Sequence, residues 1–201
     1  MGAVLRWAPA AALAAAVVAA CGSSQPPPKT APIPRQLLAE ARPIGNGARF
    51  HPPATGPVAG RCSSRLGPRI GVHIEVFAAN RVVLVPAGIG TLPPRTIFAG
   101  RITNARCYGD VVTIDPTGLL LVRPGVRLDV ASIFRSWGQP LSSRRVASFA
   151  VPAGGHVAVF VAGHSRPGPP GSVPLTRHAE IVLEVGPLVP PHASYTFPPG
   201  T

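Results

Sequence analysis

One cysteine close to the N-terminus has the sequence context of a covalent modification. Val18, Ala19, Ala20 and Cys21 close an apolar segment and are followed by the polar residues 22–25. An apolar residue, two small residues and a cysteine form a bacterial lipobox, in which the thiol attacks a lipid donor and the small residues admit a peptidase. The pattern predicts acylation of Cys21, with several acyl chains giving a stable anchor. An ordinary secretory signal with an incidental cysteine is the alternative.

The segment before Cys21 has the composition of a cleaved leader. Arg6 supplies a positive charge, and residues 7–20 are rich in alanine and valine. This stretch is shorter than the roughly 20 residues that a helix needs to cross a bilayer. It therefore predicts a signal peptide over residues 1–20 rather than a transmembrane helix. We expect the mature chain at the extracytoplasmic face of the cell membrane, anchored by its lipid.

Two further cysteines are predicted to form a disulfide. Cys62 and Cys107 remain once Cys21 is assigned to the lipid, and an exported chain folds in an oxidising compartment. Closing a loop of about 45 residues would stabilise the fold by roughly 4 kcal/mol on the chain-entropy account. A metal-binding pair and two free thiols are the alternatives.

Histidines offer only separate candidates for a metal site. None of the six forms an HxH or HxxxH pair. His73 lies in a predicted strand and His178 precedes one, so two neighbouring strands could bring these two side chains together. A lone strand histidine is more often a surface or hydrogen-bonded residue than a ligand. We therefore expect neither a metal nor another cofactor, with His73 and His178 as the candidates if a metal binds.

The carboxylates do not form a catalytic pattern. No G-x-S-x-G motif is present, and Asp115 and Asp129 have the positions of a turn residue and a helix cap. Glu180 and Glu184 fall on the same face of one predicted strand, which is typical of a solvated face. An enzyme is therefore not expected.

Composition predicts one domain with a positively charged surface. Hydrophobic residues make up 46% of the chain, which is enough for a core, whereas 22 glycines and 27 prolines indicate long loops. The net charge of +12 is almost entirely arginine, since Lys29 is the only lysine. This charge favours anionic lipid, a wall polymer or an acidic envelope protein as partner, although a GC-rich genome would give the same bias. Nucleic acid is not expected, because only 5% of residues are aromatic.

Periodicity predicts the elements of the domain. Residues 70–78 alternate as a strand, residues 79–80 form a turn, and residues 81–85 return as a second strand. A short strand is expected over residues 95–101. Asp115-Pro-Thr-Gly118 is a β-turn sequence between strands 110–114 and 119–122. Further strands are predicted over 145–151, 156–162 and 180–185, the first two joined across residues 152–155.

One helix is predicted, and it follows the second hairpin. Asp129 is a suitable N-cap, and the apolar residues that follow at helical spacing are Val130, Ile133, Phe134 and Trp137. Gly138 ends the helix. The element order predicts an α+β fold, mostly antiparallel sheet with one helix and β-grasp-like, with a small β-sandwich as the alternative. The predicted boundaries are a lipidated, Pro-rich tether over 21–61, a globular domain over 62–188 and an irregular tail over 189–201.

Several pieces of the domain resemble a family of exported bacterial proteins whose biochemical role is undefined. The more specific pieces are Pro-Ala-Gly-Ile-Gly at 86–90 and Trp-Gly-Gln-Pro-Leu at 137–141, and the resemblance spans residues 70–187. Relatives carry extra histidines, which imply metal binding in those proteins, where this chain has Gly71, Val112, Ile114 and Leu121. His73, Cys107 and Asp115 are retained. The departure implies that this chain has lost such a metal or never needed it.

Together these features predict a membrane-anchored lipoprotein outside the cytoplasm that acts as a non-catalytic binding or interaction module at the cell envelope. A metal or small-ligand carrier or sensor is the alternative, and an enzyme is the least favoured class.

Overall fold

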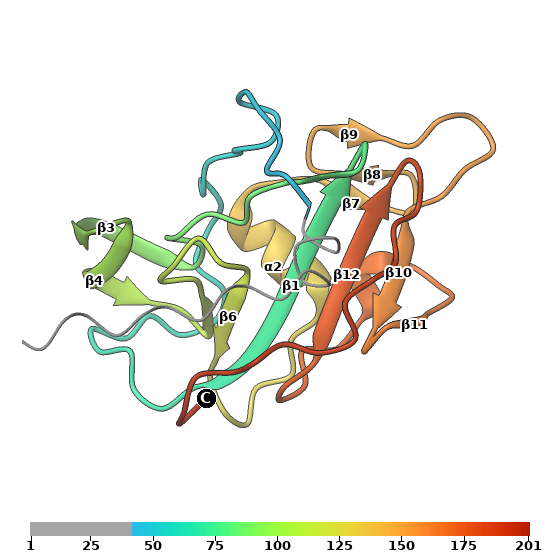
Figure 1. Ribbon diagram of the computed structural model, residues 1–201. Coiled ribbons are helices and arrows are strands. Elements are labelled where there is room, and N and C mark those ends of the chain that lie inside the picture. Colours follow the sequence, from blue (N-terminus) through green and yellow to red (C-terminus); the bar gives the residue numbers. More distant parts are fainter. Residues whose placement is uncertain (1–41) are drawn as a thin grey trace, which may run out of the picture.

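The computed structural model describes residues 42–201, and these residues form one sheet-rich body (Figure 1). The predicted signal peptide, the lipobox with Cys21 and the first part of the tether lie outside the described residues. Among the residues that are described, none forms a helix long and apolar enough to cross a membrane.

A seven-stranded sheet is the centre of the fold. Its strands follow the order β11-β10-β12-β1-β6-β5, and β2 also pairs with β1. Their bounds are β1 Ile70–Ala78, β2 Arg81–Val82, β5 Val111–Val112, β6 Leu119–Val122, β10 Ala158–Val161, β11 His164–Ser165 and β12 Glu180–Val185.

The first and last long strands are neighbours at the middle of this sheet. β1 and β12 run parallel, with His73 opposite Glu180, whereas β6 and β10 pair antiparallel with them on either side. The order β6-β1-β12-β10, with the helix between β6 and β10 in sequence, is β-grasp-like. The predicted α+β class with a mostly antiparallel sheet and one helix is confirmed.

The helix α2 covers one face of the sheet. It spans Val130–Trp137, begins at Asp129, whose carboxylate accepts a hydrogen bond from the backbone N–H of Ser132, and ends at Gly138 with φ of 79°. Alternation along the strands turns their aliphatic residues toward it. The side chains that meet in this core are Val72, Ile74, Val76, Ile181, Leu183, Ile133, Phe134 and Trp137.

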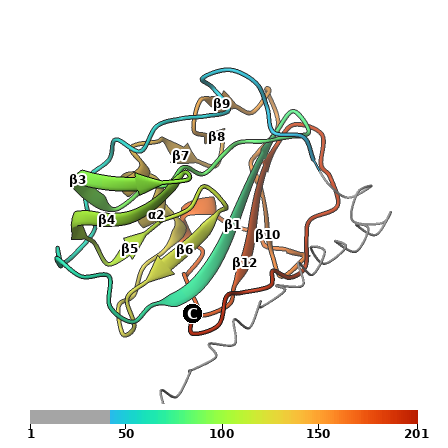
Figure 2. The same ribbon diagram turned by 60° about the vertical axis from the view of Figure 1, so that its left-hand side comes forward.

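Two small sheets add a partial second layer, which gives the body a sandwich-like character. One is a hairpin of β3, Thr91–Phe98, and β4, Arg101–Tyr108; the other joins β7, Leu141–Ser142, β8, Arg145–Val146, and β9, Phe149–Ala150. The β3–β4 hairpin lies beside β5 and β6 (Figure 2), where Ile102 and Tyr108 pack against Leu119 and Leu121. The single strand predicted over residues 95–101 is wrong, since the hairpin turns inside it at Ala99 and Gly100.

Other predicted elements differ in extent or pairing. The return strand after residues 79–80 is only Arg81–Val82. The strands predicted over 145–151 and 156–162 do not pair with each other: β8 pairs with β7 and β9, and β10 pairs with β11 and β12. A short 3-10 helix, Pro170–Ser172, lies within the loop predicted after residue 164.

The predicted disulfide between Cys62 and Cys107 is present. It links the loop before β1 to the end of β4. Residues 42–61, assigned by sequence to the tether, pack onto the domain in the structure. The N–H of Thr55 donates to the carbonyl of Trp137, and the carbonyl of Ala59 accepts from Asp110. The packed region therefore extends N-terminal to Cys62.

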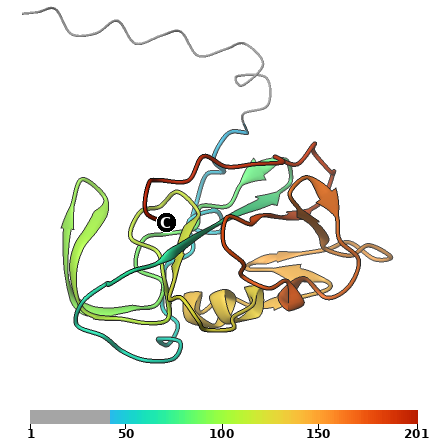
Figure 3. The same ribbon diagram turned by 90° about the horizontal axis from the view of Figure 1, so that it is seen from below.

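Residues 186–201 form a segment that we call the strap. It contains no helix or strand, and it returns across the sheet on the face opposite α2, as the view from below shows (Figure 3). Val189 of the strap is buried with Phe77 and Val182, and Tyr195 and Phe197 pack beside the residues of the β3–β4 side. The strap thus covers the second face of the central strands.

Candidate functional site

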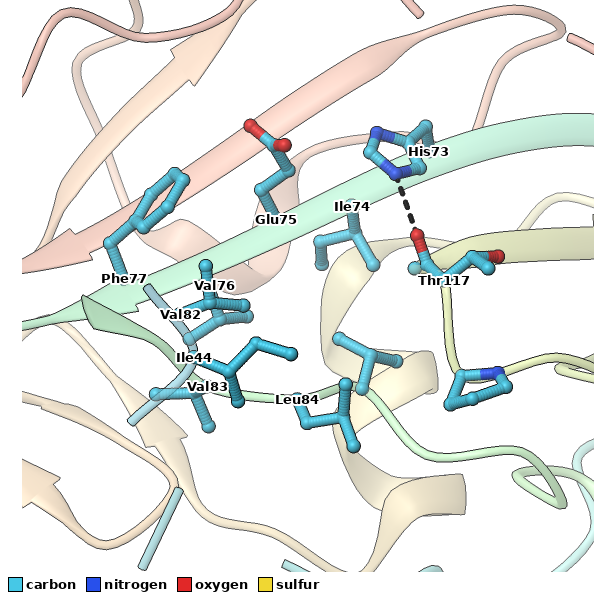
Figure 4. Close-up of a pocket in the computed structure, with 13 residues that line it drawn as sticks. Ile44, His73, Ile74, Glu75, Val76, Phe77, Val82, Val83, Leu84 and Thr117 are labelled. Carbon is cyan, nitrogen blue, oxygen red and sulfur yellow. Dashed lines mark hydrogen bonds between the residues drawn. The ribbon is translucent and has the colours of Figure 1, made fainter. Parts of the chain in front are cut away.

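Ionisable side chains occupy the strap-covered face of β1 and β12. His73 and Glu75 point away from the aliphatic Ile74 and Val76, as alternation requires (Figure 4). Glu180 and Glu184 lie on the same face of β12, and they are 2% and 1% exposed. The prediction that these two glutamates form a solvated face is wrong, because the strap lies over it.

His73 is held on both ring nitrogens. Its Nδ1 is 2.7 Å from Oε2 of Glu180, and its Nε2 is 2.9 Å from the carbonyl oxygen of Thr117 (Figure 4 shows the second contact). A carbonyl oxygen only accepts hydrogen bonds, so Nε2 carries a proton. The ring also stacks on Tyr195 of the strap, with centroids 3.8 Å apart and planes 11° apart.

The surroundings of His73 favour its charged form. Burial acts to lower the pKa of His73, but the hydrogen bond to Glu180, the charge of Glu180, the Thr117 carbonyl and the charge of Glu75 together raise that pKa above its ordinary value. The favoured state is an imidazolium that donates to a buried carboxylate.

A second histidine–glutamate pair ties the strap to the sheet. Nδ1 of His192 lies 2.9 Å from Oε1 and 2.8 Å from Oε2 of Glu75. This pair is less covered than the first, since the side chains are 37% and 19% exposed. His192 and Glu75 are therefore the solvent-exposed side of this group of residues.

Glu184 is a third buried carboxylate, and the strap also contacts it. Oε2 of Glu184 accepts a hydrogen bond of 3.1 Å from the backbone N–H of Val189. Burial raises the pKa of Glu184, and the charge of Glu75 adds to this, while Val189 and the charge of Arg42 act against it. Oε1 of Glu184 and Oε1 of Glu180 are buried without a hydrogen-bond partner among residues 42–201.

Three of these side chains are close enough to share a metal ion. His73, Glu75 and Glu180 each offer one ligand atom, and these atoms lie within 4.8 Å of one another. His178, the other histidine considered from sequence, lies outside this group. Its Nε2 is 2.7 Å from the carbonyl oxygen of Thr201, and its ring stacks on Phe197.

Three residues on this face were not predicted as site residues: Glu75, Glu180 and His192. Alternation along the strand already places Glu75 on the face of His73, two residues on, so that signal was present. The pairing of His73 with Glu180 requires the parallel register of two strands far apart in sequence. Nothing local to His192 indicates that the tail folds back onto β1.

A second feature is the tip of the β3–β4 hairpin, which carries exposed apolar side chains. Ile97 is 63% exposed and Phe98 is 75% exposed. Arg101 follows the turn and forms an ion pair with Asp115, and Arg106 is exposed further along β4. The hairpin therefore combines an apolar end with cationic sides.

Comparisons of the chain with protein-family models, with curated proteins and with solved structures found no match. The resemblance suggested by the sequence pieces at 86–90 and 137–141 accordingly stays a prediction.

Proposed function

We propose that this protein is a lipid-anchored extracytoplasmic lipoprotein whose domain is a non-catalytic binding module at the cell envelope. The β3–β4 hairpin is the binding surface, and the anionic lipid surface of the membrane is what it binds. The observation that carries this proposal is the pair of exposed apolar side chains, Ile97 and Phe98, at the hairpin tip.

The chemistry of the hairpin fits a membrane surface. Large apolar side chains that insert into the headgroup region bind lipid in proportion to the apolar area they bury. Nearby arginines add an attraction of about 1 kcal/mol each to anionic headgroups. Arg101 and Arg106 lie on β4 next to the tip. Arg61 and Arg65 are exposed in the loop before β1, which a β-bridge between Ser63 and Tyr108 connects to the end of β4. An acylated Cys21 would keep the hairpin close to such a surface.

Structural contacts of the aspartates support a non-catalytic role. Asp110 pairs with Arg123, Asp115 with Arg101, and Asp129 caps α2. Each carboxylate stabilises a turn, a strand or a helix end, and no two of them converge on a pocket.

Vesicle binding tests the hairpin. The full mature chain with Cys21→Ser, which removes the acyl anchor, is mixed with vesicles of phosphatidylcholine alone or with added phosphatidylglycerol. We expect binding only to the anionic vesicles, weakened by high salt. The double variant Ile97→Ser/Phe98→Ser should bind at least about 10-fold more weakly, since about 1.4 kcal/mol of lost apolar burial corresponds to tenfold.

A matched control separates this surface from exposed apolar residues in general. Leu188 in the strap is 63% exposed, the same fraction as Ile97, so Leu188→Ser should bind like the unsubstituted chain. Equal binding by the hairpin variant and the control would contradict a hairpin surface. No vesicle binding at all would favour a wall polymer or an envelope protein as partner.

The anchor is tested separately in cells. Cys21→Ala should leave the precursor unprocessed and unacylated, which gel mobility and labelling with a fatty acid would detect. Normal maturation of this variant would refute the lipobox.

A further inference from the structure

We propose that His73, Glu75 and Glu180 bind a divalent cation beneath the strap, with Zn²⁺ the ion that their nitrogen and oxygen donors fit best. This site is separate from the hairpin. A negative vesicle-binding experiment would therefore not refute the cation site, and a negative cation-binding experiment would not refute the hairpin surface.

The donor set supports a borderline metal ion. One imidazole and two carboxylates converge, with ligand atoms within 4.8 Å of one another. Zn²⁺ takes histidine nitrogens and carboxylate oxygens at about 2.0–2.2 Å, so binding one ion would draw these three atoms closer together. Cys62 and Cys107 are joined in a disulfide and offer no thiolate to such a site.

A buried, unpartnered oxygen points to a missing positive charge. Glu180 is 2% exposed, and its Oε1 accepts no hydrogen bond from any residue in the described part of the chain. Burying a carboxylate with an unsatisfied oxygen is costly unless a cation or a donor compensates it. A cation bound between Glu180 and Glu75 would give this oxygen a partner.

The backbone already orients His73 in the way that metal-binding histidines are oriented. Such a histidine usually donates its other ring N–H to a carbonyl or carboxylate, which fixes the ring and its tautomer. Here Nε2 of His73 donates to the carbonyl oxygen of Thr117 at 2.9 Å. Nδ1 lies 2.7 Å from Oε2 of Glu180, so an ion bound between these two atoms would take the place of the proton that they share.

The strap places a partly exposed histidine next to Glu75. Nδ1 of His192 lies 2.8 Å from Oε2 of Glu75, and the side chains of His192 and Glu75 are 37% and 19% exposed. His192 is not one of the residues whose ligand atoms converge, so it stays the hydrogen-bond partner of Glu75 and links the strap to β1 beside the ion.

Calorimetric titration with ZnCl₂ tests the site. The tag-free mature chain with Cys21→Ser is stripped with a chelator, and Zn²⁺ binding is compared with Glu180→Gln, Glu75→Gln and Glu184→Gln. We expect one Zn²⁺ per chain. Binding should weaken at least about 10-fold in the first two variants, since even the outer-shell partners of a metal ligand contribute that much.

Glu184→Gln is the matched control, because Glu184 is an equally buried glutamate on the same face of β12 but lies outside the ligand group. It should bind Zn²⁺ like the parent chain. Circular dichroism establishes that each variant is folded, and if Glu180→Gln unfolds, the more exposed Glu75 decides the result. Absence of Zn²⁺ binding by the parent chain, or undiminished binding by a folded Glu75→Gln variant, would overturn the proposal.

Discussion

On the helix side of the central sheet, alternate residues of β1 and β12 are aliphatic and pack against α2 in one large apolar cluster. On the strap side, Phe77 and Val182 pack against Val189 of the strap. The other side chains of this face are ionisable: His73, Glu75, Glu180 and Glu184. The same two strands thus face an apolar core on one side and a charged, hydrogen-bonded cluster on the other.

The two faces of this sheet therefore contribute differently: one supplies folding stability, and the other carries the ionisable side chains. Apolar burial on the helix side contributes most of the free energy of folding. Buried charges on the strap side contribute little net stability even when they are paired. Cation binding is the role that we propose for two of the glutamates on this side, Glu75 and Glu180.

Removing the largest side chain of the helix-side core should have the greatest effect on stability. Trp137 is fully buried, and its Nε1 donates to the carbonyl oxygen of Pro52. Trp137→Ala should lower the free energy of unfolding by about 3–5 kcal/mol, measured by urea denaturation. Phe98→Ala, at a side chain 75% exposed, should change it by less than about 0.5 kcal/mol. Similar losses of unfolding free energy in both variants would contradict the view that the helix-side core is the main source of stability.

The disulfide should come next in size. It fixes the end of β4, which belongs to a much smaller apolar cluster beside the strap. The double variant Cys62→Ser/Cys107→Ser should lose about 2–4 kcal/mol, seen as a lower melting temperature. Reductant should lower the melting temperature of the parent chain to the same value and leave the variant unchanged. A variant as stable as the parent would mean that the strap side needs no covalent support.

The strap itself should respond to loss of its aromatic contact. Tyr195 stacks on His73 and meets Phe197 edge-on. Tyr195→Ala should cost about 1 kcal/mol, the worth of an aromatic pair, and should speed amide hydrogen exchange in residues 186–201. Tyr195→Phe keeps the ring and should exchange like the parent chain. If Tyr195→Ala leaves exchange unchanged, the stack does not hold the strap.

The smallest effect concerns pH. Burial raises the pKa of Glu184, so the folded state binds this proton more tightly than the unfolded state. The contribution of Glu184 to stability is therefore present below its unfolded pKa and is lost as pH rises through the folded value. Glu184→Gln should thus gain stability relative to the parent chain between about pH 4 and about pH 7. Denaturation curves at both pH values check this, and a difference that does not change with pH would contradict it.

Local signals in the sequence were sufficient for about half of the architecture. Alternation predicted Ile70–Ala78, the Asp115-to-Gly118 turn predicted the β5–β6 hairpin, and a cap with helical spacing predicted α2. Each of these features is decided by residues within a few positions of one another. The disulfide was predicted because Cys62 and Cys107 are the two cysteines that remain when Cys21 is assigned to the lipid.

The rest depended on contacts distant in sequence. The β3–β4 hairpin was hidden because its turn lies within a run that includes Thr96, Ile97 and Phe98 and is typical of a single strand. The burial of Glu180 and Glu184 could not be predicted, since the strand pattern does not show that a later segment will cover it. His73 was a candidate from sequence, but its partners were not, because they come from β12 and the strap.

The parallel pairing of β1 and β12 also has a consequence for the time at which the domain can form. His73 and Glu180 are 107 residues apart in the chain, and this pair lies at the middle of the sheet. Contacts of such long range close slowly and late. A chain that crosses a membrane N-terminus first would present β1 to the far side long before its central neighbour arrives. During that interval the edge of β1 that pairs with β12 has no partner, whereas β2 and β6 can already pair with the other edge. If the chain is exported as we propose, this central pairing forms only after β12 has crossed the membrane. Any truncation before residue 180 removes the strand that completes the middle of the sheet.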